Sequence, residues 1–134
     1  MANKQFDLIV FDWDGTLMDS AATIVGCLQS AARDLGLPTP DPAACSHVIG
    51  LGLPEALRLA VPDLAPEHYS RMVERYRYHY LSQDHDLVLF PGVREMLQQL
   101  GQAGHFLAVA TGMGRVGLNR ALNSTGLLTM FDAT

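Results

Sequence analysis

The sequence predicts an α/β fold: a Rossmann-like parallel sheet, incomplete in this chain, with an inserted block of α-helices. Two apolar stretches, FDLIVF at residues 6–11 and HFLAVA at residues 105–110, have the composition of buried parallel strands. Each stretch ends in a polar turn that contains glycine, and a helical pattern follows it. Alternating strands and helices predict a parallel sheet.

The residues after the first strand predict helices only, up to residue 83. The first helix has an apolar stripe that ends at Gly36, and Asp19 or Ser20 is expected to cap its start. The stripe consists of Ile24, Leu28, Ala31 and Leu35. Asp41 and Pro42 form a cap and first-turn pair for another helix.

Two more helices are expected at residues 54–61 and 66–82. The second has Tyr69, Met72, Val73, Tyr76 and Tyr80 on one face, and this spacing favours packing against neighbouring helices over a stacking platform.

A second α/β unit follows this helical block. A helix is expected after Pro91 and Gly92, then the strand at 105–110, then a helix at 115–125. Residues 130–132 read as the entry to a third strand. We therefore expect residues 1–19 and 85–134 to form the core and residues 20–84 to form a separate helical part.

Composition excludes several classes of protein. The 134 residues include 14 acidic and 9 basic side chains, a net charge of -5, which disfavours nucleic acid as a partner. No apolar run approaches the roughly 20 residues of a membrane span, and the N-terminus lacks the pattern of a secretory signal. The two cysteines, Cys27 and Cys45, have no metal or redox spacing, so we expect a reducing, cytoplasmic location.

Two carboxylates follow the first strand at a spacing of two residues. Asp12 and Asp14 point the same way if the extended geometry continues, and Trp13 points opposite. Carboxylates this close repel one another unless a cation or a shared proton compensates. Magnesium accepts such oxygen ligands, so the pattern predicts a magnesium site at the end of the strand.

Small polar residues complete the predicted site. Gly15 allows backbone amides to approach an anion, and Thr16 and Thr111 offer hydroxyl donors from two strand ends, with Gly112 beside the second. In parallel sheets, ligands bind beyond the carboxyl ends of the strands. The set predicts a phosphate cradle that contains a carboxylate nucleophile.

The stretch FDWDGTLMDS resembles the first motif of the haloacid-dehalogenase-like superfamily, an apolar strand followed by Asp-x-Asp-Gly-Thr-Leu-x-Asp-Ser. The stretch LFPGVREMLQQLGQAGHFLAVATGMGRVGLNRAL is similar to the second core segment of that superfamily. The helical insertion is similar to the cap of the phosphoglycolate-phosphatase-like branch. The resemblance covers nearly the whole chain.

This resemblance implies roles for individual residues. Asp12 is the expected nucleophile that becomes an aspartyl phosphate, and Asp14 is the expected general acid and base. Magnesium is expected on the Asp12 carboxylate and the Asp14 backbone carbonyl, and Thr111 is expected to hydrogen-bond the phosphoryl group. An alkoxide leaving group needs a proton and a halide does not, so Asp14 favours phosphate esters over dehalogenation.

Segments around these motifs allow only less specific interpretations. The turn Gly50-Leu51-Gly52 is either a substrate contact of the cap or a simple break between helices. Asp19 and Ser20 fit the family pattern, but helix capping explains them most simply. Residues 84–86, Asp-His-Asp, are expected to form a solvated linker between cap and core.

Two elements of the family are not identifiable in this sequence. One is a catalytic lysine: Lys4 precedes the first strand, and position 113, where some relatives have lysine, is Met113. The other is a late acidic pair, because Asp132 is the only acidic residue after Thr111. We expect the first three-fifths or so of a family member, with little activity alone and an uncovered sheet edge that favours self-association.

The expected function is magnesium-dependent hydrolysis of a small phosphorylated metabolite through an aspartyl phosphate. The alternative is a non-catalytic remnant or interaction module that keeps the fold. A receiver-type signalling domain also places a phosphoacceptor aspartate at a strand end, but the long helical insertion argues against it. The residues do not identify the substrate.

Overall fold

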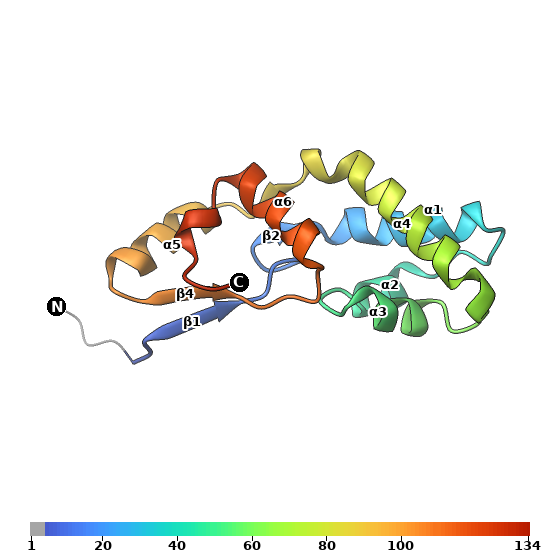
Figure 1. Ribbon diagram of the computed structural model, residues 1–134, viewed down its shortest axis with the longest axis horizontal. Coiled ribbons are helices and arrows are strands. Elements are labelled where there is room, and N and C mark those ends of the chain that lie inside the picture. Colours follow the sequence, from blue (N-terminus) through green and yellow to red (C-terminus); the bar gives the residue numbers. More distant parts are fainter. Residues whose placement is uncertain (1–4) are drawn as a thin grey trace.

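The structure, a computed structural model, describes residues 5–134; Lys4 lies outside the described residues. Figure 1 shows an elongated chain with a small sheet and two helices at one end and a group of helices at the other. We call residues 21–83 the helical region and the other described residues the α/β region. The boundaries expected at residues 19/20 and 84/85 stay a prediction.

The α/β region is built on two parallel strands, β1 (Leu8–Phe11) and β4 (Phe106–Val109). The register pairs Leu8 with Phe106 and Phe11 with Val109, which confirms the predicted parallel pairing. Helices α5 (Val93–Gln102) and α6 (Arg115–Thr125) lie over one face of this sheet (Figure 1). Both strands are shorter than the apolar stretches at 6–11 and 105–110.

One face of the sheet is covered and the other is open. Leu107 and Val109 point into a core, together with Trp13, Leu97 and Leu122, and all five are buried. Alternation along the strands sends other apolar side chains to the opposite face. Those side chains are Leu8 (51 % exposed), Val10 (54 %) and Phe106 (59 %). Among the described residues, no strand pairs with the outer edge of β1.

Two details differ from the sequence prediction. Residues 128–130 form a 3₁₀ turn, η3 (Leu128–Met130), and the expected third strand is reduced to a single parallel bridge between Ala133 and Ala108. A two-residue antiparallel pair, β2 (Met18–Asp19) with β3 (Val88–Leu89), was not predicted. Two residues are too few to show a period, so sequence patterning does not reveal such a pair.

The helical region consists of four helices and one short turn. Their bounds are α1 (Ala21–Asp34), α2 (Pro42–His47), α3 (Leu53–Ala60), η1 (Pro66–His68) and α4 (Tyr69–Gln83). The predicted helix at 66–82 begins instead with the 3₁₀ turn η1, and α4 continues one residue further. Asp41 caps α2 as predicted, because its carboxylate accepts a hydrogen bond from the Ala43 amide at 2.7 Å.

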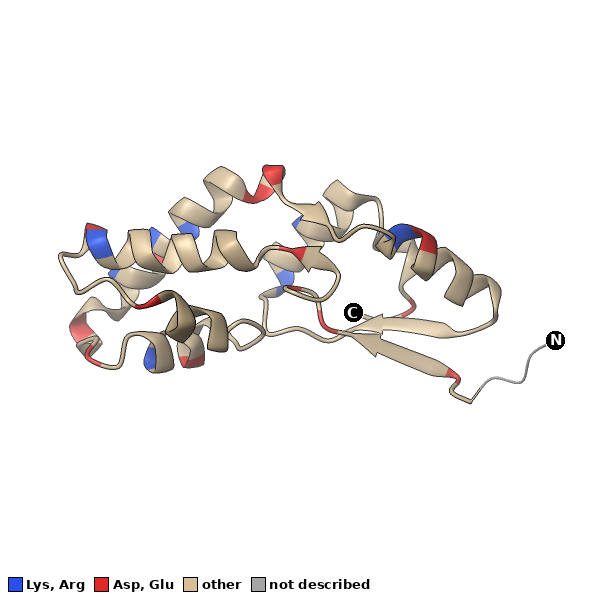
Figure 2. Ribbon diagram, turned by 180° about the vertical axis from the view of Figure 1, so that it is seen from behind, with Lys and Arg blue, Asp and Glu red and all other residues tan. Residues whose placement is uncertain are grey.

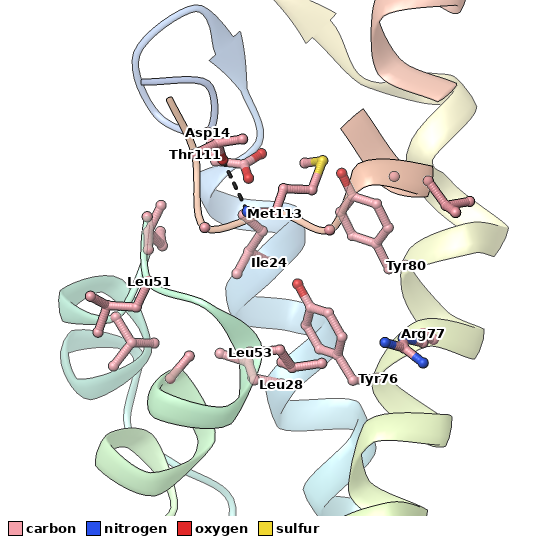
Figure 3. A pocket seen from close by; sticks show the side chains of 18 of the residues that line it. Asp14, Ile24, Leu28, Leu51, Leu53, Tyr76, Arg77, Tyr80, Thr111 and Met113 are labelled. Carbon is pink, nitrogen blue, oxygen red and sulfur yellow. Dashed lines mark hydrogen bonds between the residues drawn. The ribbon is translucent and has the colours of Figure 1, made fainter. Parts of the chain in front are cut away.

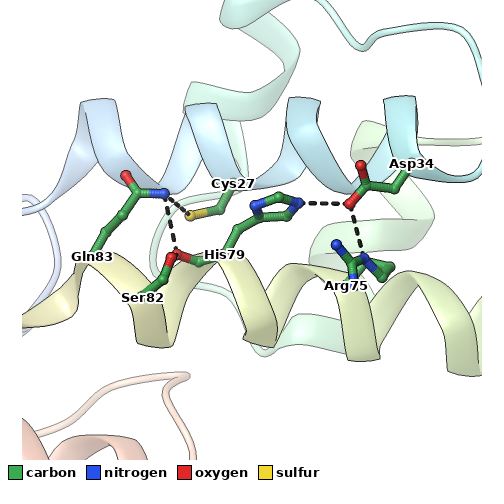
Figure 4. Close-up of polar contacts among 6 residues, drawn as sticks. All are labelled: Cys27, Asp34, Arg75, His79, Ser82 and Gln83. Atoms are coloured by element: carbon green, nitrogen blue, oxygen red, sulfur yellow. Dashed lines mark hydrogen bonds and ion pairs between the residues drawn. The ribbon is translucent and has the colours of Figure 1, made fainter.

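Helices α1 and α4 lie side by side over most of their length, joined by apolar and polar contacts (Figure 4). The Asp34 carboxylate accepts hydrogen bonds from Arg75 Nε at 2.9 Å and pairs with His79 Nε2 at 2.6 Å. These contacts hold the pKa of Asp34 below its usual value, with His79 the larger cause. No helix in residues 5–134 combines the length and the hydropathy needed to cross a membrane.

Candidate active site

Asp12 and Asp14 lie at the carboxyl end of β1, where the strand turns toward α1. The Asp12 Oδ1 atom accepts a hydrogen bond from the Trp13 amide at 2.8 Å. Trp13 is fully buried in the core, whereas both aspartates are only partly buried. Trp13 and the aspartates thus lie in different surroundings, in keeping with the predicted alternation. Figure 2 shows that β1 and β4 have no charged side chain along their length, with acidic residues just beyond β1.

A tight turn follows the two aspartates. The Trp13 carbonyl accepts hydrogen bonds from the amides of Thr16, Leu17 and Met18, at 3.0–3.2 Å. Gly15 has a φ of 76°, a left-handed conformation that glycine adopts without strain. Leu17 and Met18 are buried and anchor the turn, while Gly15 and Thr16 stay exposed at its tip. The tip can therefore be reached by a ligand.

The Asp14 carboxyl group is positioned by Ser20. Ser20 Oγ is buried and donates a hydrogen bond to Asp14 Oδ1 at 2.7 Å. Ser20 occupies the N-cap position of α1 as predicted, but its side chain makes no capping hydrogen bond. The expectation that Ser20 serves to cap the helix is therefore wrong: its hydroxyl binds the second aspartate instead.

Burial raises the pKa of Asp14 above its ordinary value; the charge of Asp12 adds to this, and the Ser20 hydrogen bond opposes it. A carboxyl group with a raised pKa keeps its proton at higher pH, as a general acid requires. Position and electrostatics thus both suit Asp14 to proton transfer.

Thr111 lies beside this turn, just beyond the carboxyl end of the neighbouring strand β4. The ladder pairs Phe11 with Val109, so the residues just after the two strands are neighbours. Thr111 Oγ1 accepts a hydrogen bond from the Met113 amide at 3.1 Å, which leaves its own proton available to a ligand oxygen. The structure thus brings the Asp12–Thr16 turn and the Thr111–Gly112 turn to one end of the sheet.

The loop Gly50-Leu51-Gly52 of the helical region packs directly on these turns. A β-carbon on Gly112 would lie 2.4 Å from the Leu51 carbonyl carbon and 2.6 Å from the Gly52 amide nitrogen, so only glycine fits there. Gly50 has a φ of 98°, and a β-carbon on it would lie 3.1 Å from Asp12 Oδ2. The loop therefore lies against both predicted clusters; its role in binding substrate stays a prediction.

A cavity of about 550 Å³ opens between the helical region and the α/β region. Asp14 and Thr111 lie at one end of it, and apolar side chains from α1, α4 and the loop at 48–53 form its walls (Figure 3). Tyr76 and Tyr80 also line it. Their packing against the helices was predicted, but their place in the cavity was not. Their i, i+4 spacing one helical turn apart was the available signal.

The residues present can supply only part of a metal's coordination. In the described part of the chain, no group of three or more His, Cys, Asp or Glu side chains could hold a metal. The Asp12 carboxylate and the Asp14 backbone carbonyl are hard oxygen donors, and magnesium commonly binds one or two protein oxygens together with water and phosphate. This donor set fits magnesium held jointly with a phosphate ligand.

Residues 84–86 form a 3₁₀ turn, η2 (Asp84–Asp86), not a wholly solvated linker. His85 and Asp86 are exposed as expected. The Asp84 carboxylate, however, accepts hydrogen bonds from Arg120 at 2.9–3.1 Å. This pair joins η2, directly after the helical region, to α6, beside the cavity.

Curated proteins related to this chain include phosphatases and a tyrosine-protein kinase. It is 39 % identical over 131 residues to the Probable phosphatase IndB of Dickeya dadantii, covering 93 % of this chain and 56 % of that protein. It is 33 % identical to the phosphoglycolate phosphatase of Vibrio cholerae, over 81 % of this chain and 51 % of the relative. It is also 33 % identical to the tyrosine-protein kinase PtkA of Mycobacterium tuberculosis, over 93 % of this chain and 42 % of the kinase. The chain thus spans about half the length of these relatives.

Solved structures agree with these relatives. A crystal structure of a predicted phosphoglycolate phosphatase from Haemophilus somnus matches with a TM-score of 0.86 at 26 % identity, over 98 % of this chain and 63 % of that one. The Mycobacterium tuberculosis PtkA structure matches with a TM-score of 0.79 at 32 % identity, over 95 % of this chain and 58 % of the PtkA chain. The family model of haloacid dehalogenase-like hydrolases matches residues 9–134. The chain therefore belongs to the haloacid dehalogenase-like hydrolases.

Proposed function

We propose that the protein is a magnesium-dependent phosphohydrolase that acts on small phosphorylated metabolites through an aspartyl phosphate on Asp12. The observation that carries this proposal is the pairing of Asp12 with Asp14, which lies at one end of the cavity and whose pKa is raised by burial. A nucleophile and a proton donor side by side are what phosphate ester cleavage requires.

In the first step, an Asp12 carboxylate oxygen attacks phosphorus and the bond from phosphorus to the substrate oxygen breaks. The leaving alkoxide takes the proton of the Asp14 carboxyl group, so an alcohol departs. The Thr111 hydroxyl donates a hydrogen bond to a phosphoryl oxygen, where charge must be stabilised during transfer.

In the second step, water attacks the aspartyl phosphate and the bond between phosphorus and the Asp12 oxygen breaks. Asp14, now ionised, takes a proton from the attacking water, and inorganic phosphate leaves. Asp12 is regenerated as a carboxylate and Asp14 as an acid. The Ser20 hydroxyl holds the Asp14 carboxyl in place through both steps.

Asp12 and the Asp14 carbonyl would hold the magnesium ion, which supplies positive charge to the phosphoryl oxygens when bound. The names of the phosphatase relatives support this function. We also propose that the helical region is the cap of this site, since its loop at 50–52 packs on Gly112 and its helices line the cavity.

Trapping with beryllium fluoride tests the assignment of Asp12. With magnesium present, we expect beryllium fluoride to raise the melting temperature of the 134-residue chain and to give a bound fluorine signal by NMR. Asp12→Asn should lose both effects, whereas the control Asp19→Asn, at an exposed acid of the same segment, should keep them. Absence of any magnesium-dependent complex would favour the non-catalytic alternative.

We expect slow turnover by this 134-residue chain, because Lys4 is the only lysine of the sequence and it precedes β1. Asp12 lies at the other end of that strand. A lysine beside a nucleophilic aspartate offsets the negative charge that phosphate brings. The measurement is phosphate release at high chain concentration with and without magnesium.

We further propose that the chain associates through the outer edge of β1. That edge is unpaired within the described residues, and Leu8 and Val10 of β1 are 51 % and 54 % exposed. Unpaired apolar strands pair with other chains.

A further inference from the structure

The cavity beside Asp14 is large and mostly apolar where a leaving group would lie. Its volume is about 550 Å³, within the usual range for pockets that take whole small molecules. Ile24, Leu28 and Leu53 form its walls, and Met113 lies between Asp14 and Tyr80 (Figure 3). A two-carbon acid would leave most of this space empty.

The charged side chains of the cavity wall are engaged or lie away from Asp14. Three arginines line it, and two of them have partners: Arg115 donates to the Thr134 carbonyl at 2.7 Å, and Arg120 to the Asp84 carboxylate. Arg77 is exposed and lies one helical turn beyond Tyr80, on the side away from Asp14 (Figure 3). A carboxylate close to the phosphate would therefore be partly buried with no free arginine beside it, at a cost in free energy.

Two hydroxyl groups point into the same cavity. The rings of Tyr76 and Tyr80 stack with centroids 6.1 Å apart, and Figure 3 shows both hydroxyl ends directed toward the end where Asp14 lies. Neither hydroxyl hydrogen-bonds another residue of the described chain. Burial raises the pKa of each tyrosine, so both stay protonated and can donate to a neutral oxygen or nitrogen.

We propose that the leaving group of the substrate is an uncharged alcohol of about the size of an aromatic ring, bearing a polar atom for the tyrosine hydroxyls, and not a short hydroxy acid. This inference rests on the proposed phosphohydrolase function. The bonds that form and break are those already described for that function. Apolar walls bury the ring, and Tyr80 and Tyr76 fix its orientation.

Binding of alcohols tests the cavity without any phosphate chemistry. We expect benzyl alcohol to bind the 134-residue chain at least about tenfold more tightly than glycolate, measured by NMR chemical shifts. Tyr80→Phe, which keeps the ring, should weaken a hydroxylated ligand such as 4-hydroxybenzyl alcohol severalfold and leave benzyl alcohol unchanged. Tyr78→Phe is the matched control, because Tyr78 lies on the same helix, is 59 % exposed and does not line the cavity.

An added positive charge provides the second variant. Met113→Lys places a cation beside Asp14 on a partly exposed loop, and it should shift the preference toward glycolate. The inference would be overturned if the unaltered chain bound glycolate as tightly as benzyl alcohol or more tightly. It would also be overturned if the chain bound neither benzyl alcohol nor 4-hydroxybenzyl alcohol.

Phosphonates separate this inference from the proposed function. With magnesium present, benzylphosphonate should bind more tightly than phosphonoacetate. If neither phosphonate responds to magnesium while benzyl alcohol still binds, the phosphohydrolase proposal fails and the apolar pocket stands. If both respond and phosphonoacetate binds more tightly, the pocket inference fails and the phosphohydrolase proposal stands.

Discussion

The helical region closes a core of its own, whereas the α/β region leaves one face of its sheet uncovered. Leu28, Leu57 and Met72 are at most 1 % exposed within the four helices. In the sheet, Leu8 and Val10 are half exposed, although β1 is the strand that positions the catalytic candidates. The helical region thus has the closed core, whereas the α/β region holds the candidate catalytic residues.

The two regions also contribute different properties to the site. The α/β region supplies the acids, at the ends of strands whose parallel pairing brings them together. The helical region supplies apolar walls, and burial is the main cause of the raised pKa of Asp14. The proposed chemistry would use both regions: without the helices beside it, Asp14 would be more exposed and its pKa closer to that of an ordinary aspartate.

The largest expected effect concerns proton transfer. Asp14→Asn should lower the rate of hydrolysis of benzyl phosphate by about 10²–10⁴-fold, because the alkoxide then leaves without a proton. The drop should be much smaller for p-nitrophenyl phosphate, whose leaving group is stable as an anion. Steady-state rates with both esters measure this difference, and an equal drop would argue against Asp14 as the acid.

The comparison of the two cores predicts unequal costs for similar truncations. Leu57→Ala should lower the free energy of unfolding by about 2–5 kcal/mol, since it empties a closed helical core. Leu8→Ala, on the open face of the sheet, should change it by no more than about 0.5 kcal/mol. Urea unfolding followed by circular dichroism gives both values. A large loss from Leu8→Ala would mean that another chain covers this face in solution.

The open strand predicts an effect on association. Val10→Lys should shift the chain toward monomer, because a charge on an edge strand opposes pairing with a second edge. Leu59→Lys is the matched control: Val10 and Leu59 are both 54 % exposed, but Leu59 lies on α3. Sedimentation velocity at several concentrations measures the change. A chain that is monomeric before any substitution would contradict the proposed association.

The sequence predicts most of what local patterns encode. The parallel pairing of β1 with β4, the helix at 115–125 and the glycine stop at Gly36 all follow from period and turn chemistry, and the structure confirms them. The short pair of β2 and β3 and the reduction of the third strand depend on tertiary contacts that involve one or two residues each. Patterns of that length contain no periodic signal.

The same limit applies to the site. Asp12, Asp14 and Thr111 could be placed together because strand ends of a parallel sheet share an edge. The hydrogen bond from Ser20 to Asp14 could not, because capping explains a serine before a helix equally well. The contact of Gly112 with the loop at 50–52 could not be predicted either, because it joins segments far apart in the sequence.

The smallest expected effect is on how stability depends on pH, which has opposite signs for Asp34 in the helical region and Asp14 in the α/β region. The pKa of Asp34, in the helical region, is lowered by His79 and Arg75, so its contribution to stability is present above the pKa of an unfolded aspartate, about 4, and is lost as pH falls further. The pKa of Asp14 is raised, so its contribution is full below about 4 and is lost as pH rises through the raised value.

These signs predict that Asp34→Asn lowers the melting temperature at pH 6 and has little effect near pH 2. Asp14→Asn should instead raise the melting temperature at pH 6 in the absence of magnesium, with the gain disappearing below about pH 4. Thermal melts across this range measure both. If both variants shift the melting temperature in the same direction at pH 6, the pKa of Asp14 is not raised in solution, because burial and the repulsion from Asp12 both make removal of its charge stabilising.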